Sequence, residues 1–290
     1  MTHTRALPFK CSAVITDVDG TLVNDDKRLT SRASSAVAKL RASGIIFSII
    51  SSRPPRGIAP LLGSLGITTP IGCFNGGMIA TANLSIITEH LLSPAVARRT
   101  VEMLNAQGVQ VWVFNGQDWL VRDPDGPYVG LEQRTVGFPA KIVKEFEASL
   151  DGAAKIVGVS RDFEFLACCE SELRVALADD ASVARSQPYY LDITHPLANK
   201  GAALSEIAKL LAVPLIEIAV IGDGSNDVAM FERSGLSIAM GNASTEVRQA
   251  ADLVTDSNRE EGFAHAVERF ILDTGRSSKR VEPTRVGGCA

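Results

Sequence analysis

The feature that most constrains this 290-residue chain is an alternation of short β-branched apolar segments with amphipathic segments of helical period. Near the N-terminus the apolar segments are 12–16, 45–50 and 70–74, and the helical segments are 31–43 and 58–65. Strands that are buried on both faces and joined by helices form parallel sheets, because a parallel connection needs a crossover. The pattern therefore predicts an α/β fold with a Rossmann-like, doubly wound parallel sheet.

The pattern changes between residues 82 and 195. Strands at 109–115 and 119–122, joined by Gly116-Gln117, predict a hairpin, and a helix is expected at 94–107. We further expect strands at 155–159, 163–169 and 189–193, a strand or an extended entry segment at 84–92, and helices at 142–150 and 172–178. Hairpins mixed with helices predict an α+β module with antiparallel pairing.

The first pattern returns near residue 200, with strands at 216–221, 236–239 and 253–255 and helices at 201–211, 227–234, 244–251 and 263–272. We therefore predict one catalytic core, built from residues 1–81 and 196–274, that is divided by an inserted domain at 82–195. Residues 275–290 have no apolar period and are expected to be a disordered tail.

Composition excludes several classes of protein. With 29 basic and 33 acidic residues the net charge is −4, whereas a nucleic-acid binder usually has a basic excess. The longest apolar stretch, 44–50, falls far short of the ~20 residues that span a bilayer. The five cysteines show no CxxC spacing, which predicts no zinc site, no disulfide framework and a reducing, cytoplasmic location. We expect neither nucleic acid nor membrane as a partner, and the sequence leaves the oligomeric state open.

Short polar residues follow four of the core strands. Ligands of an open parallel sheet bind at the carboxyl ends of its strands, so these residues are expected at one edge of the sheet. They are Asp17, Asp19, Gly20 and Thr21 after the first strand, Ser51, Ser52 and Arg53 after the second, Asn75 and Gly76 after the third, and Asp223, Asn226 and Asp227 after the strand at 216–221.

Four carboxylates at one edge would repel one another unless they share a cation or protons. Oxygen ligands of this kind favour Mg²⁺, which also binds substrate phosphate. Lys200 opens a helix near the same edge and supplies a positive charge. These groups predict a phosphoryl-transfer site with Asp17 as a nucleophile. Asp19, two residues on, is expected to point the same way and to exchange protons.

Two motifs resemble the haloacid dehalogenase superfamily of phosphatases. Residues 17–22 read D-V-D-G-T-L, and residues 222–230 read G-D-G-S-N-D-V-A-M. The second motif and the insertion at 82–195 are similar to the Cof-type subgroup, whose C2B-like cap lies between these motifs. The resemblance covers residues 10–80 and 196–272.

The resemblance implies a role for each matching residue. Asp17 would be the nucleophile and a Mg²⁺ ligand, and Asp19 the general acid/base and a ligand through its carbonyl. Ser51 and Lys200 would contact the phosphoryl group, and Asp223 would bind the metal. Residues implied to support the metal are Asn226 and Asp227, and those implied to bind phosphate or substrate are Gly20, Thr21, Ser52, Asn75 and Gly76.

The chain departs from the subgroup at residues 51–53, where Ser-Ser-Arg replaces the common Thr-Gly-Arg. Arg53 is expected either to touch substrate or to brace its loop. In the inserted domain, candidate contacts to the leaving group are Arg122, Asp123, Tyr128, Arg134 and His195.

The sequence thus predicts a Mg²⁺-dependent phosphomonoester hydrolase that acts on a small phosphorylated metabolite, a sugar phosphate above all, through an aspartyl-phosphate. A phosphomutase or phosphotransferase of the phosphomannomutase type is the alternative. A phospho-accepting signalling module is disfavoured, since a receiver domain has about 120 residues and no inserted cap. A dehalogenase is disfavoured because Asp19 supplies the acid that a phosphate leaving group needs.

Overall fold

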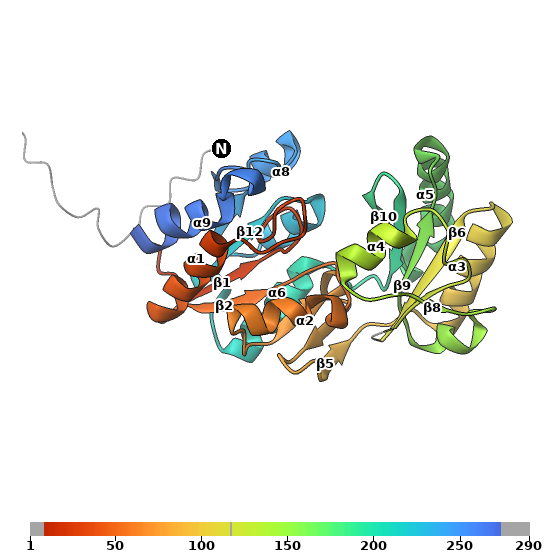
Figure 1. Ribbon diagram of the computed structural model, residues 1–290, viewed down its shortest axis with the longest axis horizontal. Helices are drawn as coiled ribbons and strands as arrows, with labels where there is room; N and C mark the ends of the chain where they lie inside the picture. Colours follow the sequence, from red (N-terminus) through yellow and green to blue (C-terminus); the bar gives the residue numbers. More distant parts are fainter. Residues whose placement is uncertain (1–8, 117, 274–290) are drawn as a thin grey trace, which may run out of the picture.

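A five-stranded parallel sheet, built from both ends of the chain, forms the core (Figure 1). The computed structural model describes residues 9–116 and 118–273. The strand order is β14-β13-β12-β1-β2, so β1 lies in the middle, with Val14 opposite Ala219 of β12 and Phe47 of β2. The strands are β1 (Ala13–Thr16), β2 (Ile46–Ile49), β12 (Ile218–Gly222), β13 (Leu236–Ala239) and β14 (Leu253–Val254).

Helices cover both faces of this sheet. Alternate residues of β1 enter different apolar clusters: Val14 packs on the side of α1 and α9, and Ile15 on the side of α6 and α7. Thr30 caps α1 by accepting a hydrogen bond from the Ala33 amide at 3.1 Å. The core helices are α1 (Ser31–Ala42), α2 (Pro55–Leu65), α6 (Lys200–Leu211), α7 (Val228–Phe231), α8 (Thr245–Ala250) and α9 (Gly262–Ala266). The predicted doubly wound α/β fold is confirmed.

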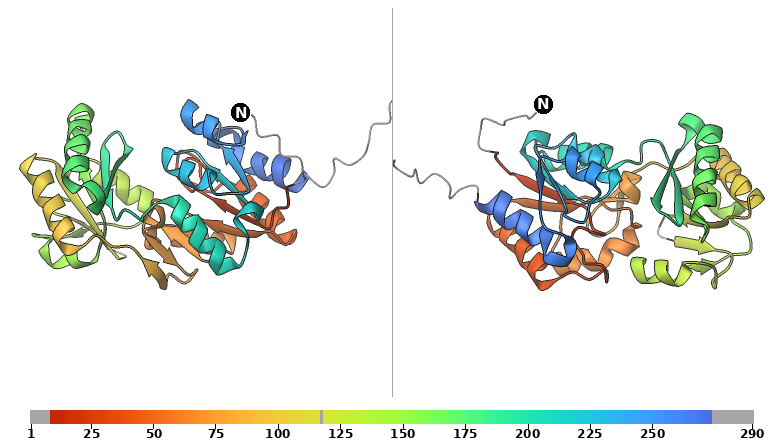
Figure 2. Two further views of the ribbon diagram at one scale, coloured as in Figure 1. Left: turned by 180° about the vertical axis from the view of Figure 1, so that it is seen from behind. Right: turned by 90° about the horizontal axis from the view of Figure 1, so that it is seen from above.

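A six-stranded sheet lies at the other end of the molecule, joined to the core by two segments (Figure 2). We call it the inserted sheet. Its order is β10-β11-β9-β6-β7-β8, antiparallel except between β7 and β8. The strands are β6 (Gln110–Asn115), β7 (Asp118–Val121), β8 (Lys141–Ile142), β9 (Ala153–Val159), β10 (Ser182–Gln187) and β11 (Tyr190–Thr194). The helices α3 (Pro94–Ala106) and α5 (Phe163–Leu177) cover one face, and α4 (Val129–Val136) lies between the sheet and α2.

A small antiparallel sheet, β3-β4-β5, lies beside α6. Its strands are β3 (Ile71–Cys73), β4 (Met78–Ala80) and β5 (Ile86–Glu89). The third strand was expected in the parallel sheet, but only one bridge, Ile50 to Gly72, joins β3 to that sheet. The turn at Phe74–Gly76 returns the chain as a hairpin, which explains the difference. The predicted domain border at 81/82 falls between β4 and β5, which pair with each other; the division into domains stays a prediction.

Two secondary-structure predictions in the insertion are wrong. The strand expected at 163–169 is the start of α5, because Asp162 caps the helix and Leu166, Cys169 and Leu173 are buried at helical spacing. The helix expected at 142–150 is β8 followed by the 3₁₀ turns of Glu147–Gly152, in which only Leu150 is buried. The prediction also omitted α4 and β10 of the insertion. In the core, the helix expected at 227–234 is reduced to a 3₁₀ turn at 225–227 and the four residues of α7.

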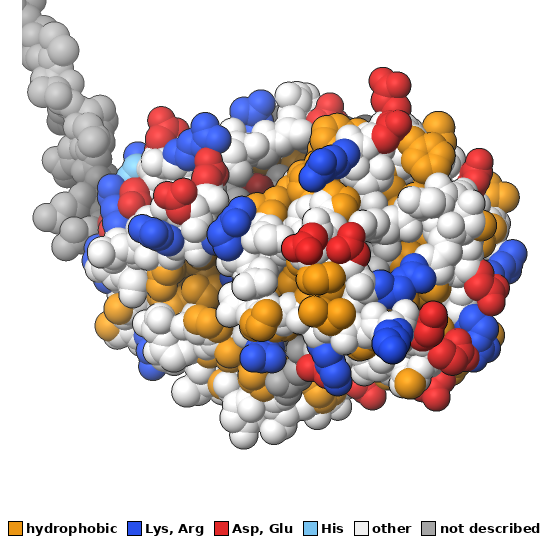
Figure 3. All heavy atoms as spheres, turned by 45° about the vertical axis from the view of Figure 1, so that its right-hand side comes forward, with side chains coloured by type: hydrophobic (Ala, Val, Ile, Leu, Met, Phe, Trp, Pro, Cys, Tyr) orange, Lys and Arg blue, Asp and Glu red, His pale blue; other side chains and the backbone are white. Residues whose placement is uncertain are grey.

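Within the described ranges, no helix is long and apolar enough to span a membrane. The predicted tail at 275–290 lies outside those ranges. On the side of the molecule where the inserted sheet comes forward, acidic and basic side chains are interspersed (Figure 3).

Candidate active site

Lys200 lies between two carboxylates at the carboxyl edge of the core sheet. Its ammonium contacts Asp17 Oδ1 and Asp227 Oδ1, each at 2.5 Å. Asp17 directly follows β1, and Lys200 is the first residue of α6, whose N-cap Asn199 accepts from the Ala202 amide. All three charged side chains are buried, with Asp227 0% and Lys200 1% exposed. A lysine is disfavoured at a helix N-terminus, and these two contacts explain its presence there.

Burial governs the electrostatics of this group. The pKa of Asp17 is raised well above its usual range because burial disfavours the charged form; Lys200 opposes this shift, while Asp227 and Asp223 add to it. Burial alone would lower the pKa of Lys200, but Asp17 and Asp227 outweigh it and raise that pKa. The single ammonium of Lys200 thus contacts two carboxylates, Asp17 and Asp227, and cannot balance the charge of both when both are ionised.

Asp223 completes a cluster of three carboxylates. Asp17, Asp223 and Asp227 each offer one oxygen within 4.8 Å of the others. Burial, then Asp227, raise the pKa of Asp223 to about 6. Such a cluster of buried oxygen ligands fits a hard divalent cation such as Mg²⁺, which would relieve the repulsion. Asp227 Oδ2 accepts from the amides of Asp223 and Gly224 at 2.8 Å, which fixes the loop.

Asp19 lies in a different environment from Asp17. Arg53 donates to both of its oxygens at 2.7 Å, and Lys27 lies 2.9 Å from Oδ1. Burial would raise the pKa of Asp19, but Arg53 and Lys27 outweigh it and lower the value to about 2. Because β1 ends at Thr16, strand alternation does not orient Asp19, and its carboxylate contacts Arg53 rather than Lys200. Arg53 also donates to the Gly57 carbonyl and braces its loop.

Hydrogen bonds connect Ser51 and Asn75 to each other and to neighbouring residues of the site. The Ser51 side-chain oxygen accepts from the Arg53 amide at 3.2 Å, and the Ser51 carbonyl accepts from the Asn75 amide at 2.8 Å. The Asn75 side chain accepts from Asn226 at 2.9 Å. The ends of β2, β3 and β12 are therefore connected, and Ser52, next to this group, is partly exposed.

Two glycines allow close approaches. Gly20 has φ +82°, and a Cβ there would overlap the Asp223 carboxylate. Gly76 has φ +96°, and a Cβ there would lie 2.6 Å from Ala203 Cβ of α6. The Thr21 hydroxyl, next to Gly20 in sequence, donates a hydrogen bond to Asp223 Oδ1 at 3.0 Å. Glycine is thus needed at both positions because of the backbone conformation and the lack of space for a Cβ, and not because of side-chain chemistry.

Two residues at the site were missed by the sequence reasoning. Asn242 donates to the Gly20 carbonyl at 3.0 Å and to Asp223 Oδ2 at 3.1 Å. It follows β13, so the strand-end rule applied to one more strand would have found it. Lys27 offered no such signal, because it reaches Asp19 only through the fold of the loop after β1.

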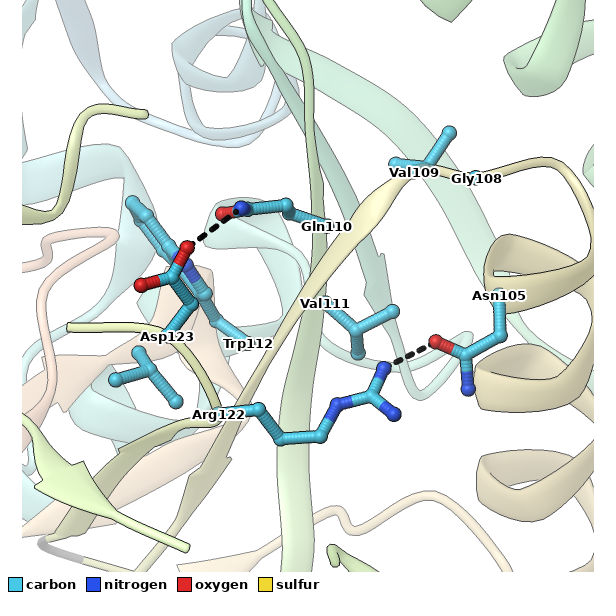
Figure 4. Close-up of a pocket in the computed structure, with 9 residues that line it drawn as sticks. Asn105, Gly108, Val109, Gln110, Val111, Trp112, Arg122 and Asp123 are labelled. Atoms are coloured by element: carbon cyan, nitrogen blue, oxygen red, sulfur yellow. Dashed lines mark hydrogen bonds between the residues drawn. The ribbon is translucent and has the colours of Figure 1, made fainter. Parts of the chain in front are cut away.

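The candidate contacts from the insertion are dispersed. Arg122 hydrogen-bonds Asn105 of α3 and lies 5.2 Å from the Phe146 ring, on the face of the inserted sheet that the helices cover. With Asp123 it lines a cavity of about 240 Å³ at one end of β6 and β7 (Figure 4). Arg134 is exposed, and His195 accepts from the Leu197 amide in the connection to α6. Tyr128 stacks on Tyr189 with ring centroids 4.2 Å apart.

A family model described as haloacid dehalogenase-like hydrolase matches residues 14–267, which is most of the chain. The chain belongs to this family. The predicted resemblance to the Cof-type haloacid dehalogenases is confirmed, and this hydrolase is an enzyme.

Known relatives of this haloacid dehalogenase-like hydrolase agree over nearly their whole length. A crystal structure of a haloacid dehalogenase-like hydrolase from Bacteroides thetaiotaomicron is 30% identical with a TM-score of 0.83, and the match covers 90% of this chain and 99% of that one. A Bacillus subtilis 5-amino-6-(5-phospho-D-ribitylamino)uracil phosphatase is 26% identical, with 91% of this chain and 98% of the relative covered. Another B. subtilis protein, named a phosphatase, is 26% identical, with 88% and 98% covered.

Proposed function

We propose that this enzyme, a phosphatase of the haloacid dehalogenase family, is a Mg²⁺-dependent phosphomonoester hydrolase of a small phosphorylated metabolite. The observation that carries the proposal is a group of four side chains at the edge of the sheet: the buried Asp17, Asp227 and Lys200, and the half-buried Asp223. Asp17, Asp223 and the Asp19 carbonyl would hold the cation, supported by Asn226 and Asp227. When bound, Mg²⁺ would neutralise charge on the phosphoryl oxygens.

In the first half-reaction, an Asp17 oxygen attacks phosphorus and the bond from phosphorus to the leaving oxygen breaks. A proton from Asp19 goes to the leaving oxygen, giving an alcohol and an aspartyl-phosphate. In the second, Asp19 takes a proton from water, the resulting oxygen attacks phosphorus, and phosphate leaves with Asp17 restored. Lys200 and the Ser51 hydroxyl stabilise the phosphoryl oxygens, together with the segments of Gly20, Thr21, Ser52, Asn75 and Gly76.

The contacts of Asp19 bear on its proposed role. Paired with Arg53 and Lys27 and with a pKa of about 2, it is ionised and can accept a proton, but it is a weak base while those two contacts hold. A carboxylate in that state donates no proton, so protonation of the leaving oxygen requires these two contacts to loosen when substrate binds. Arg53 is then a residue that positions Asp19 and tunes its basicity.

The substrate that we propose is a sugar or polyol phosphate, with the inserted sheet as the cap that selects the leaving group. Relatives named as phosphatases of a ribityl-bearing phosphate support this class. In this proposal the enzyme has two domains: a catalytic core at 1–81 and 196–274, and a substrate-selecting cap at 82–195. A cytoplasmic location also stays a proposal, which the free thiols of Cys11, Cys73, Cys168 and Cys169 support.

The test is phosphate release from a panel of sugar phosphates and 5-amino-6-(5-phospho-D-ribitylamino)uracil, with Mg²⁺ and with chelator. We expect release that requires Mg²⁺. Asp17→Asn should lose at least about 10³-fold in kcat while remaining folded, because an amide oxygen is a poor nucleophile. Asp118→Asn, which removes an exposed carboxylate from β7, is the matched control and should retain activity.

Full activity in the Asp17→Asn variant would contradict the nucleophile assignment. Isomerisation of a hexose phosphate without release of phosphate would instead establish the phosphomutase alternative.

A further inference from the structure

One face of the inserted sheet is directed toward the core rather than toward α3 and α5. Cross-strand pairing places Trp112 opposite Val157 and Phe114 opposite Lys155, and Asp192 opposite Val157 on the next strand. Side chains that are paired across strands share a face. The side chains of the intervening residues, such as Val113 and Ile156, pack against α3 and α5 in a separate cluster. Phe114 lies 5.8 Å, centroid to centroid, from Phe74, the residue before Asn75 of the candidate active site.

This face holds buried polar atoms that have no hydrogen-bond partner. Among the described residues, these atoms include both carboxylate oxygens of Asp192 and the indole nitrogens of Trp112 and Trp119. Asp192 is 7% exposed, and each indole ring 1%. Folded proteins pair nearly all such groups, so several on one face point to a ligand that completes them.

Two further charged residues stand beside Asp192. The Lys155 ammonium lies 3.6 Å from Asp192 Oδ2, too far for a good hydrogen bond, and 4.8 Å from the centroid of the Phe114 ring. Lys155 is 7% exposed and Glu132 of α4 is 8% exposed. We call Glu132, Lys155 and Asp192 the polar cluster; it contains two carboxylates and one ammonium.

The charges of the polar cluster act on the proposed catalytic residues of the core. Burial raises the pKa of Glu132, Lys155 opposes that shift, and Asp192 and Asp19 add to it. The Glu132 charge also acts on Arg53, which holds Asp19. The Glu132 charge therefore interacts both with the other members of the polar cluster and with Asp19, the proposed general acid/base.

We propose that the polar cluster, with the indole N–H groups of Trp112 and Trp119, binds the hydroxyl groups of an uncharged polyol leaving group. This inference rests on the proposed phosphatase function. Carboxylates accept hydrogen bonds from hydroxyl groups, and the ammonium and indole groups donate to hydroxyl oxygens. Because two carboxylates face one ammonium, a second anionic group on the substrate is repelled. Entry requires the inserted sheet and the core to separate at this junction, as in closure around a substrate.

The test uses two substrates that differ at one end. Sorbitol 6-phosphate ends in CH₂OH where 6-phosphogluconate ends in a carboxylate, and the phosphate and chain length are the same. We expect the wild-type kcat/KM for sorbitol 6-phosphate to exceed that for 6-phosphogluconate by about tenfold or more. In assays at a pH above the raised pKa of Glu132, Asp192→Asn and Glu132→Gln each remove a negative charge at equal size and should reduce this ratio severalfold. Asp118→Asn, on the same sheet but outside the polar cluster, should leave the ratio unchanged.

The ratio separates specificity from damage to the fold, because misfolding lowers both rates together. Equal wild-type rates for the two substrates, or a preference for 6-phosphogluconate, would overturn the proposal. An unchanged ratio in both folded variants would also overturn it. Acetyl phosphate, whose leaving group has no hydroxyl groups, tests the underlying phosphatase function separately. If the wild type releases phosphate neither from acetyl phosphate nor from the two polyol substrates, the proposed phosphatase function fails. Release from acetyl phosphate alone overturns the polyol inference only.

Discussion

At the scale of the residue, Lys200 pairs with two carboxylates of the candidate active site. Its ammonium is buried between Asp17 and Asp227. Removal of one partner from a buried ion pair leaves an uncompensated charge, which costs more than the pair itself contributes.

Lys200→Met should therefore lower the free energy of unfolding by about 3–5 kcal/mol in urea denaturation. Lys10→Met is the matched control, because Lys10 pairs with Glu217 at 2.9 Å but its side chain is 74% exposed. The control should change stability by less than about 1 kcal/mol. Equal losses in the two variants would show that burial of Lys200 is unimportant.

Glu132 gives a prediction for the pH dependence of stability. Its pKa in the folded protein is raised above the ordinary value of 4.5, mainly by burial. In the window between 4.5 and the raised value the unfolded chain loses this proton and the folded chain keeps it, so stability falls as pH rises.

Glu132→Gln has no carboxyl proton to lose. We expect the stability of the wild type, relative to this variant, to decrease as pH is raised from about 4 to 8. Urea denaturation at several pH values measures the difference. The exposed Glu145→Gln variant is the control and should differ from wild type by no more than about 0.5 kcal/mol throughout. A difference that grows with pH in the opposite sense would refute the argument.

At the scale of the element, the loop after β1 depends on close packing rather than on intrinsic propensity. Gly20 and Gly44 have nearly the same positive φ, +82° and +76°. A Cβ at Gly20 would overlap Asp223, whereas one at Gly44 would meet nothing within 4 Å. The two positions therefore separate backbone strain from displacement of a candidate metal ligand.

Gly20→Ala should reduce kcat/KM by about 100-fold, since small misplacements in a catalytic site have effects of this size. Gly44→Ala should cost about 1–3 kcal/mol of stability through strain and keep its activity. Phosphate release and thermal unfolding of both variants make the comparison. Similar activities in the two folded variants would show that Gly20 is not needed to place Asp223.

The apolar pattern of the sequence predicted secondary structure correctly where it fitted only one kind of element. The core strands β1, β2, β12 and β13 are short, apolar and largely buried, so the apolar run alone was enough to predict each of them. The 163–169 segment was misread because a short apolar run fits a strand or a helix equally well. Its helical state depends on the cap at Asp162 and on packing against the inserted sheet.

At the scale of the whole molecule, we expect the carboxylate cluster to couple metal binding to folding. Asp17, Asp223 and Asp227 come together only in the native state, from segments about 200 residues apart. A cation that binds the folded chain and not the unfolded chain stabilises it by mass action.

Saturating Mg²⁺ should therefore raise the Tm by several degrees over a sample in chelator, corresponding to about 2–4 kcal/mol. Asp223→Asn should lose most of this shift, and Asp118→Asn should retain it. Differential scanning calorimetry with and without Mg²⁺ measures the effect. A full shift in Asp223→Asn would place the cation elsewhere.

The sequence by itself determined the α/β core and the edge at which its polar residues gather. Both follow from local period and from the rule that parallel strands present their carboxyl ends together, and neither needs knowledge of packing. Only the tertiary structure decided that Arg53 and Lys27 hold Asp19, that Asn242 reaches Asp223, and that Glu132, Lys155 and Asp192 form one cluster. These contacts join segments whose separation in sequence carries no periodic signal, so they depend on how the loops and the inserted sheet pack against the core.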